Sequence, residues 1–502
     1  MQKMTDEKFH EKLSMIVDPY FDREFFTNLV YCMDRGKSIR EIFESAYEQL
    51  SSTPDPTTDL DKSLLQMLYA FSATSMLRES YQWLPLSQAL YSASLLRSKG
   101  SIPIPYKNLV SISPRASTLA EFTDLIRRET RAVESQERAW SSLLFLLDNR
   151  TTRSQTVATF LGYAVLNSDA LTLELLTKSI DVAVACGWKS NHIVLKRAFE
   201  RFWTNPKPLQ VAAQGWRISR ALTQPPKDGE LVWKSEWAED VWIRLTTHSV
   251  ESAWEAIDKA LASGAQIEQI FVLLGLLRGR CLFSMKTEQW SRVSASLFYG
   301  DALASVARWC PEIEIQLLAT SLCELAKLTQ VLGTATPLRP TGTQVLDGTS
   351  KDISKDRLIL RLDDVVERGE RFEALEIMTV VLKDSGLSQT VCDRLILMAS
   401  KQDAWTFDQK TIGLATILTK AYDAALRLQM SGLSPQDAVF GLLRYLSDQR
   451  ETSLDVVQKT GTYGNAMSLS TYDVSAGARI VDRFVFNQMR NAQRVKIWPS
   501  DN

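Results

Sequence analysis

Apolar side chains recur every three or four residues along most of this chain, and this spacing predicts α-helices that each bury one face. The clearest stripe lies between 119 and 147 and consists of Leu119, Phe122, Ile126, Val133, Trp140, Leu144 and Leu147. We expect one long helix there. Few segments alternate apolar and polar residues, and 357–364 is the best of them. The fold class is therefore predicted to be all-α, as an extended multi-helix bundle or an α-solenoid-like array.

Three sites carry helix-start signals. Thr118 is followed three residues later by Glu121, a capping box in which each side chain accepts from the other residue's free backbone N–H. Thr406 and Gln409 repeat the pattern before an apolar stretch, and Pro435 follows Ser434 as a first helical residue that needs no N–H partner.

One long segment without periodicity divides the chain. Residues 333–356 are rich in Gly, Pro, Thr and Ser and carry almost no large apolar residue, so they are predicted to be a linker or long exposed loop. An N-terminal helical block, 1–332, precedes it, with a Pro-rich break at 205–230 that would subdivide the block. A smaller helical block, 357–450, follows, and 451–502 is expected to be irregular with a basic and aromatic end.

The charge balance excludes a global attraction to anions. Lys plus Arg number 58 and Asp plus Glu 59, which disfavours nucleic acid as a partner. The six cysteines are widely spaced without a CxxC pair, so we expect free thiols and no zinc site. No apolar run approaches the ~20 residues of a membrane span, and no export signal is visible at the N-terminus. A cytoplasmic location is the expectation.

Metal and cofactor chemistry has little support in the sequence. The three histidines, His10, His192 and His248, lie far apart without Glu-x-x-His spacing, and we expect each at a surface or helix end. No nucleotide loop of the P-loop kind is present. We therefore predict no cofactor.

One acidic motif is a weak candidate for a metal site. Asp363, Asp364 and Glu367 match the DDxxE pattern with which all-helical prenyl-diphosphate enzymes hold magnesium. The second, downstream metal motif of those enzymes is missing after 367. The alternative is a solvated acidic helix start after the linker, and this interpretation is favoured.

Basic and aromatic residues are interleaved at the C-terminal end. Between 476 and 502, five bases stand against two acids, so this stretch is the best candidate surface for an acidic partner or nucleic acid. A C-terminal helix that docks on the rest of the chain is the alternative, and this interpretation is favoured. The candidate partner-binding residues are Arg479, Arg483, Arg490, Arg494, Lys496 and Trp498.

A tryptophan stripe lies within the N-terminal block. Trp233 and Trp237 are one helical turn apart, and Val241 extends the stripe. The stripe could stack a flat ligand, but a packed helix seam is the favoured interpretation.

Three stretches, 83–90, 166–202 and 433–448, resemble segments of large bacterial helical proteins of the questin oxidase-like group. The resemblance is scattered and implies an all-α oxidative enzyme or a degenerate relative of one. Members of the group are His-rich, whereas 64–80 offers Gln66, Thr74 and Ser75 and no histidine. No functional residue is carried over from it.

The sequence favours a soluble, all-helical scaffold or interaction protein without an evident catalytic site, working through a protein partner or self-association. Two alternatives stay open. One is a helical oxidase-type enzyme that acts on an apolar substrate between helices, and the other is an RNA-coating protein that uses the basic C-terminal segment.

Overall fold

The structure is a computed structural model that describes residues 5–17, 25–52, 58–77, 82–96, 118–129, 132–205, 210–220, 233–332, 355–382, 388–400, 410–430 and 436–459. Every regular element within these ranges is a helix, and none is a strand. The all-α prediction is confirmed. The stretch 357–364, whose alternation came nearest to a strand, lies within helix α18, Lys355–Glu367.

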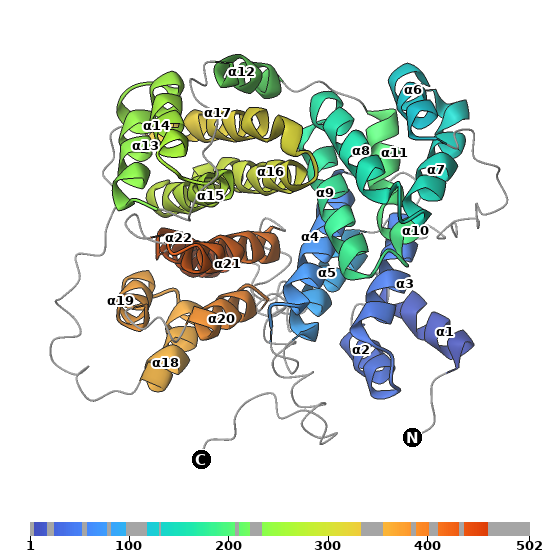
Figure 1. Ribbon diagram of the computed structural model, residues 1–502. Helices are drawn as coiled ribbons and strands as arrows, with labels where there is room; N and C mark the ends of the chain where they lie inside the picture. Colours follow the sequence, from blue (N-terminus) through green and yellow to red (C-terminus); the bar gives the residue numbers. More distant parts are fainter. Residues whose placement is uncertain are drawn as a thin grey trace.

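Helices α1 to α11, from the first 204 residues, form one side of the molecule (Figure 1). Contacts join α4 to α5 and α9, and α7 to α6, α8 and α11. These helices are α1 Asp6–Ile16, α2 Phe25–Asp34, α3 Ile39–Ser51, α4 Thr58–Thr74, α5 Trp83–Leu96, α6 Leu119–Glu129, α7 Val133–Asp148, α8 Arg153–Asn167, α9 Ala170–Ala185, α10 Asn191–Val194 and α11 Lys196–Thr204.

The other side of the molecule is a stack of helical layers, and in Figure 1 the layer of α21 and α22 lies directly below that of α15 and α16. The helices of this side are α12 Gln210–Ser219, α13 Ser235–Thr247, α14 Val250–Ala262, α15 Ile267–Ser284, α16 Trp290–Trp309, α17 Glu314–Leu332, α18 Lys355–Glu367, α19 Arg371–Val381, α20 Ser388–Ser400, α21 Thr411–Arg427 and α22 Gln436–Lys459, with short 3-10 turns at Thr287–Gln289 and Pro311–Ile313.

Two glycines let α15 and α22 approach backbone to backbone. A Cβ atom on Gly279 would lie 2.7 Å from the Cα of Ala438, and one on Gly441 would lie within van der Waals overlap of the Gly279 carbonyl oxygen. Because α22 follows the 333–356 segment and α15 precedes it, helices from both sides of that segment share one core. The division into two blocks stays a prediction, and 333–354 lie outside the described residues.

The prediction of one unbroken helix over 119–147 is wrong. The structure has α6 and α7 instead, and Ala132 between them is extended, with φ −76° and ψ 109°. The indole N–H of Trp203 donates to the Ala132 carbonyl oxygen at 2.9 Å, so the break is stabilised by a contact from α11 that local spacing cannot reveal.

The capping box at Thr118 is confirmed. Its backbone N–H donates to a Glu121 carboxylate oxygen at 3.2 Å, and the Glu121 N–H donates to the Thr118 hydroxyl at 3.3 Å. The other two predicted starts, Thr406 and Ser434, lie outside the described residues, although helices follow both. No helix in the described ranges combines the length and apolarity that a membrane crossing requires.

Candidate functional site

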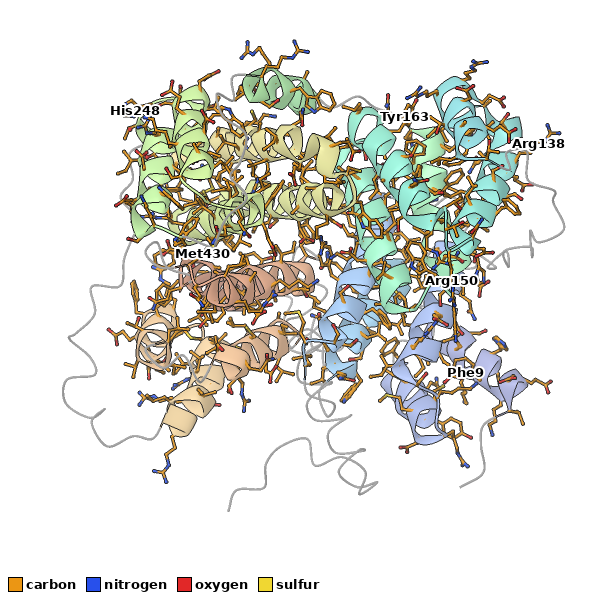
Figure 2. The ribbon with its side chains drawn as sticks, viewed as in Figure 1. Phe9, Arg138, Arg150, Tyr163, His248 and Met430 are labelled. Atoms are coloured by element: carbon orange, nitrogen blue, oxygen red, sulfur yellow. The ribbon has the colours of Figure 1, made fainter. Side chains whose placement is uncertain are left out.

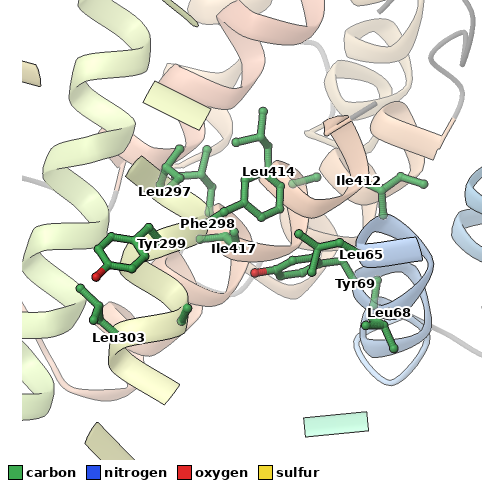
Figure 3. Close-up of a cluster of buried hydrophobic side chains, with 14 of the residues drawn as sticks. Leu65, Leu68, Tyr69, Leu297, Phe298, Tyr299, Leu303, Ile412, Leu414 and Ile417 are labelled. Carbon is green, nitrogen blue, oxygen red and sulfur yellow. The ribbon is translucent and has the colours of Figure 1, made fainter. Parts of the chain in front are cut away.

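Charged side chains converge where α4, α9, α16 and α21 meet. These four helices contact one another in pairs, α4 with α9 and α21, and α16 with α9 and α21. We call the residues gathered there the lysine cluster: Tyr69, Lys178, Asp181, Asp301 and Lys420. Figure 3 shows the apolar side of the junction, where Tyr69, Phe298 and Ile417 come together from three helices.

Helix α9 contributes the central residues because its ionisable residues share one face. Its sequence is apolar except for a few polar residues, and Glu174, Lys178 and Asp181 are spaced by four and three residues. This spacing puts all three side chains on the same side of a helix. Glu174 and Lys178 are buried, and Asp181 is half-buried.

Lys178 lies between two carboxylates. Its Nζ atom is 3.2 Å from Oδ2 of Asp181 and 3.3 Å from Oδ2 of Asp301, and it lies 4.3 Å from the ring centroid of Tyr69. The Tyr69 hydroxyl donates to Asp301 at 2.9 Å. Lys178 therefore joins α9 to α16, and Tyr69 joins α4 to the same carboxylate.

These contacts keep the pair ionised in the interior. Burial alone would lower the pKa of Lys178, but the carboxylates of Asp301 and Asp181 raise it above its ordinary value. Burial opposes ionisation of Asp301 as well, and Lys178 holds the pKa of that carboxyl below its ordinary value. Burial raises the pKa of Tyr69 well above its usual range, so its hydroxyl stays a donor.

The cluster opens towards solvent along α16. Ser305 donates to Oδ1 of Asp181 at 3.3 Å, and Nη2 of Arg308 lies 3.6 Å from the same oxygen. Arg308 is 68% exposed, so the chain of charges from Tyr69 ends at the surface.

Lys420 differs from the other members of the cluster. The positive charge of Lys178, together with burial, lowers the pKa of Lys420 to about 8. Asp301 and Asp181 act on it in the opposite direction but do not compensate. Lys178 already lies within ion-pair distance of both carboxylates.

Glu174, which is buried on the same face of α9, also has a strongly shifted pKa. Burial raises its pKa to about 8, and the nearby charges of Asp169 and Asp301 act in the same direction. At neutral pH most of this carboxyl is therefore protonated. Along α9 it lies between Lys178 and the first turn of the helix, where a second group of charges from α4, α9 and α11 meets.

That second group, the arginine cluster, consists of Asp61, Asp169, Thr172, Arg197 and Arg201. Asp61 is 1% exposed and accepts from Nε of Arg197 and Nη1 of Arg201, each at 2.7 Å. Arg201 also lies 3.0 Å from Oδ2 of Asp169 and donates to the Thr172 hydroxyl at 3.0 Å. Asp169 caps α9 by accepting from the Thr172 N–H at 2.8 Å.

Gln66 sets the position of α21 against α4. Its side-chain oxygen accepts from the backbone N–H of Gly413 at 2.8 Å, in the first turn of α21. A Cβ atom on Gly413 would lie 2.5 Å from the ring of Phe298, so the close approach requires glycine. This contact fixes the helix that carries Lys420.

The arrangement can hold helices in register. Paired carboxylates and bases specify a unique packing if all members are satisfied. The arginine cluster and the two ion pairs of Lys178 are of this kind. The pKa of Lys420, lowered to about 8, reflects the positive charge of Lys178 beside it.

The residues predicted from the sequence lie elsewhere. Asp363, Asp364 and Glu367 belong to α18, and the side chain of Asp364 is exposed. Trp237 is buried and its ring packs edge-on against Trp233, with centroids 5.5 Å apart, as expected of a packed seam. The predicted partner-binding residues, Arg479, Arg483, Arg490, Arg494, Lys496 and Trp498, lie outside the described residues.

The histidines lie at the surface and the cysteines are free thiols, as the sequence predicted. His10, His192 and His248 are exposed, and Figure 2 shows His248 at the outer edge of the array. All six cysteines are buried and free. Among the residues whose placement is described, no group of three or more His, Cys, Asp and Glu side chains could hold a metal ion.

Sequence reasoning missed both clusters, although one signal was present. Lys178, Asp301 and Lys420 are each ionisable residues inside otherwise apolar helices. Such residues are costly to bury unless they find partners or a function. The spacing within one helix cannot identify the helix that brings the partner.

The chain matches no protein-family model, no curated protein sequence and no solved structure. The resemblance to questin oxidase-like proteins, the cytoplasmic location, the oxidase-type alternative and the RNA-coating alternative therefore stay predictions.

Proposed function

We propose that this chain is a helical scaffold that binds another protein. The observation that supports it best is how the buried charges are used. Asp61 pairs with two arginines of α11, and Asp301 pairs with a lysine of α9, so the carboxylates connect helices far apart in sequence. Buried pairs of this kind favour one packing over others, which suits a rigid array that presents helical surfaces.

The α18–α19 hairpin provides the binding surface in this proposal. Phe372, in the first turn of α19, is 68% exposed, and no other large apolar side chain in the described ranges is more exposed. The guanidinium carbon of Arg371 lies 4.8 Å from its ring centroid, and Arg368 is exposed nearby. Exposed aromatic and arginine side chains are typical of the residues that dominate binding energy at interfaces.

A photoreactive phenylalanine analogue at position 372 tests the proposal in cells. Ile243, on α13 and 50% exposed, is the matched control position. We expect a discrete cross-linked protein from position 372 and none from 243. The captured protein should then bind the purified chain, and Phe372→Ala should weaken binding at least tenfold, while Ile243→Ala leaves it unchanged. Equal capture at both positions, or no effect of Phe372→Ala, would overturn the proposal.

A further inference from the structure

The turn that follows α9, residues 186–190, holds a tryptophan in a rare backbone conformation. Gly187 ends the helix with φ 62°, and Trp188 follows with φ 64°. Glycine adopts this left-handed region readily, but a residue with a bulky side chain does not. Among the described residues, the one other non-glycine residue with a positive φ is Gln429. The N–H of Trp188 donates to the Ala183 carbonyl oxygen at 2.7 Å, and its side chain stays partly exposed. Such a conformation persists where the surrounding structure enforces it.

Two arginines from other helices hold this turn in place. Arg40 of α3 pairs with Glu44 at 2.6 Å and donates from Nη2 to a carbonyl oxygen and a hydroxyl of the turn, each at 3.1 Å. Arg153, at the start of α8, has its guanidinium carbon 5.1 Å from the centroid of the Trp188 ring. Its Nε and Nη2 donate to carbonyl oxygens in the last turn of α7, at 2.5 and 3.3 Å. The indole and the guanidinium group are therefore fixed against each other before any partner binds.

The cations beside this ring lack counter-ions in the described part of the chain. We call the surface formed by the two segments the Trp188 surface: 148–153 and 186–192. Arg150 and Lys189 are exposed and Arg153 is half-buried, and none of the three lies within ion-pair distance of a described carboxylate. Asp148 is the one acid in the two segments. The Trp188 surface therefore carries a surplus of positive charge, although the formal net charge of the whole chain is −1.

Exposed apolar side chains adjoin these cations. Val184, one turn before Trp188 on α9, is 45% exposed, and Phe145, one turn before Asp148 on α7, is 48% exposed. Tryptophan and arginine side chains dominate the binding energy at many protein interfaces. A nucleic acid would need a longer track of cations than this surface offers, because its affinity depends on many phosphate contacts. The combination of charge and apolar area fits a peptide segment that is acidic and carries an apolar residue.

We propose that the Trp188 surface binds an acidic segment of a partner protein. The carboxylates of that segment pair with Arg150 and Lys189, and one of its apolar side chains packs against the uncovered part of the Trp188 ring. Because the ring and Arg153 are already fixed, binding orders few side chains of this chain. Helix α10, beside the turn, and helix α19, which carries Phe372, lie at opposite sides of the molecule (Figure 1). This proposal and the proposed function at Phe372 can therefore fail independently.

Selection from a library of random seven-residue peptides tests the proposal, with the full chain as bait. The library is counter-selected on the double variant Arg150→Glu/Lys189→Glu, in which both exposed cations are reversed. We expect the peptides enriched on the wild type to carry more Asp and Glu than Lys and Arg, together with at least one large apolar residue. Enrichment of neutral or basic peptides, or of no peptide that prefers the wild type, would overturn the proposal.

A matched charge reversal elsewhere separates this surface from the net charge of the protein. Lys286 and Arg292 are exposed and lie beside the start of α16. Fluorescence anisotropy with the most enriched peptide should show at least tenfold weaker binding to Arg150→Glu/Lys189→Glu. Binding to Lys286→Glu/Arg292→Glu should be less than twofold weaker. Equal weakening by the two double variants would contradict a specific site.

Trp188→Gly isolates the contribution of the ring. Glycine adopts a φ of 64° without strain, so the turn is retained while the indole is lost. The affinity for the same peptide should fall at least tenfold with an unchanged circular dichroism spectrum, and Phe372→Ala should leave the affinity as it is. An unchanged affinity in Trp188→Gly would refute the role of the ring.

A single-stranded RNA of twenty uridines is the second probe. We expect no difference in RNA binding between the wild type and Arg150→Glu/Lys189→Glu. RNA binding that the double variant loses, without enrichment of acidic peptides on the wild type, would assign the Trp188 surface to nucleic acid and overturn the proposal.

Discussion

Nη1 of Arg201 lies 2.7 Å from Oδ2 of Asp61, which joins α11 to α4 across 140 residues of sequence. The second oxygen of Asp61 accepts from Arg197, so one buried carboxylate holds two guanidinium groups of a neighbouring helix. Removing one partner of a buried pair leaves uncompensated charge, which costs more than the pair contributes.

Asp61→Asn is expected to lower the free energy of unfolding by about 3 to 5 kcal/mol, because it leaves two half-buried arginines without the buried carboxylate that they share. Urea unfolding followed by circular dichroism measures the loss. Asp59, two residues earlier in α4, pairs with Lys62 at 2.9 Å but is exposed. Asp59→Asn should therefore cost less than about 1 kcal/mol. Equal losses would show that burial of Asp61 does not matter.

Lys420→Met is expected to stabilise the protein at pH 7. Its folded pKa of about 8 lies below the ordinary 10.5, so the protonated amine opposes folding at every pH below 8. This destabilisation of the folded state disappears as the pH rises from 8 to 10.5, because the amine loses its proton in the folded state first. The variant should gain about 1 to 3 kcal/mol at pH 7 over the wild type, and the gain should shrink towards pH 10.5. Unfolding curves at both pH values measure it; a gain that does not depend on pH would contradict the electrostatic explanation.

Glu174→Gln is expected to stabilise the protein at high pH, whereas the gain from Lys420→Met is largest at low pH. Because the folded pKa of about 8 is above the ordinary 4.5, the neutral carboxyl stabilises the fold below pH 4.5, and this contribution is lost as pH rises through 8. The variant and the wild type should be similar near pH 4.5, and the variant should be more stable by about 1 to 3 kcal/mol at pH 9. Glu255→Gln, at an exposed position of α14, should change stability by less than about 0.5 kcal/mol at either pH.

Gly279→Ala and Gly275→Ala compare two glycines one turn apart on α15. A methyl group at 279 would meet the α22 backbone at 2.7 Å, whereas one at 275 would lie 3.6 Å from Cβ of Ala421, an ordinary contact. We expect Gly279→Ala to cost about 1 to 3 kcal/mol and Gly275→Ala to be neutral or stabilising by up to ~1 kcal/mol. Thermal unfolding of both variants checks this, and a similar melting temperature for the two would contradict the close packing of α15 and α22.

The sequence predicted the helices well where the signal was local. The capping box of Thr118 and Glu121 and the apolar stripe that follows need only neighbouring residues. The break at Ala132 depends on Trp203, seventy-one residues later, and could not be predicted from spacing.

The candidate site could not be predicted for the same physical reason. Lys178 and Asp301 are 3.3 Å apart in the fold but belong to helices separated by more than a hundred residues. Their positions in apolar helices indicate that each needs a partner, and only the packing of α9 against α16 shows which one. The lowered pKa of Lys420 depends in turn on where Lys178 is placed.

A double-mutant cycle between Asp61 and Arg201 tests most directly whether buried charge pairs hold the helices in place. Asp61→Asn, Arg201→Met and the double variant are compared with the wild type by urea unfolding. The predicted coupling energy is at least about 2 kcal/mol, since the two side chains touch in a buried site. Additive effects, with a coupling near zero, would contradict the account.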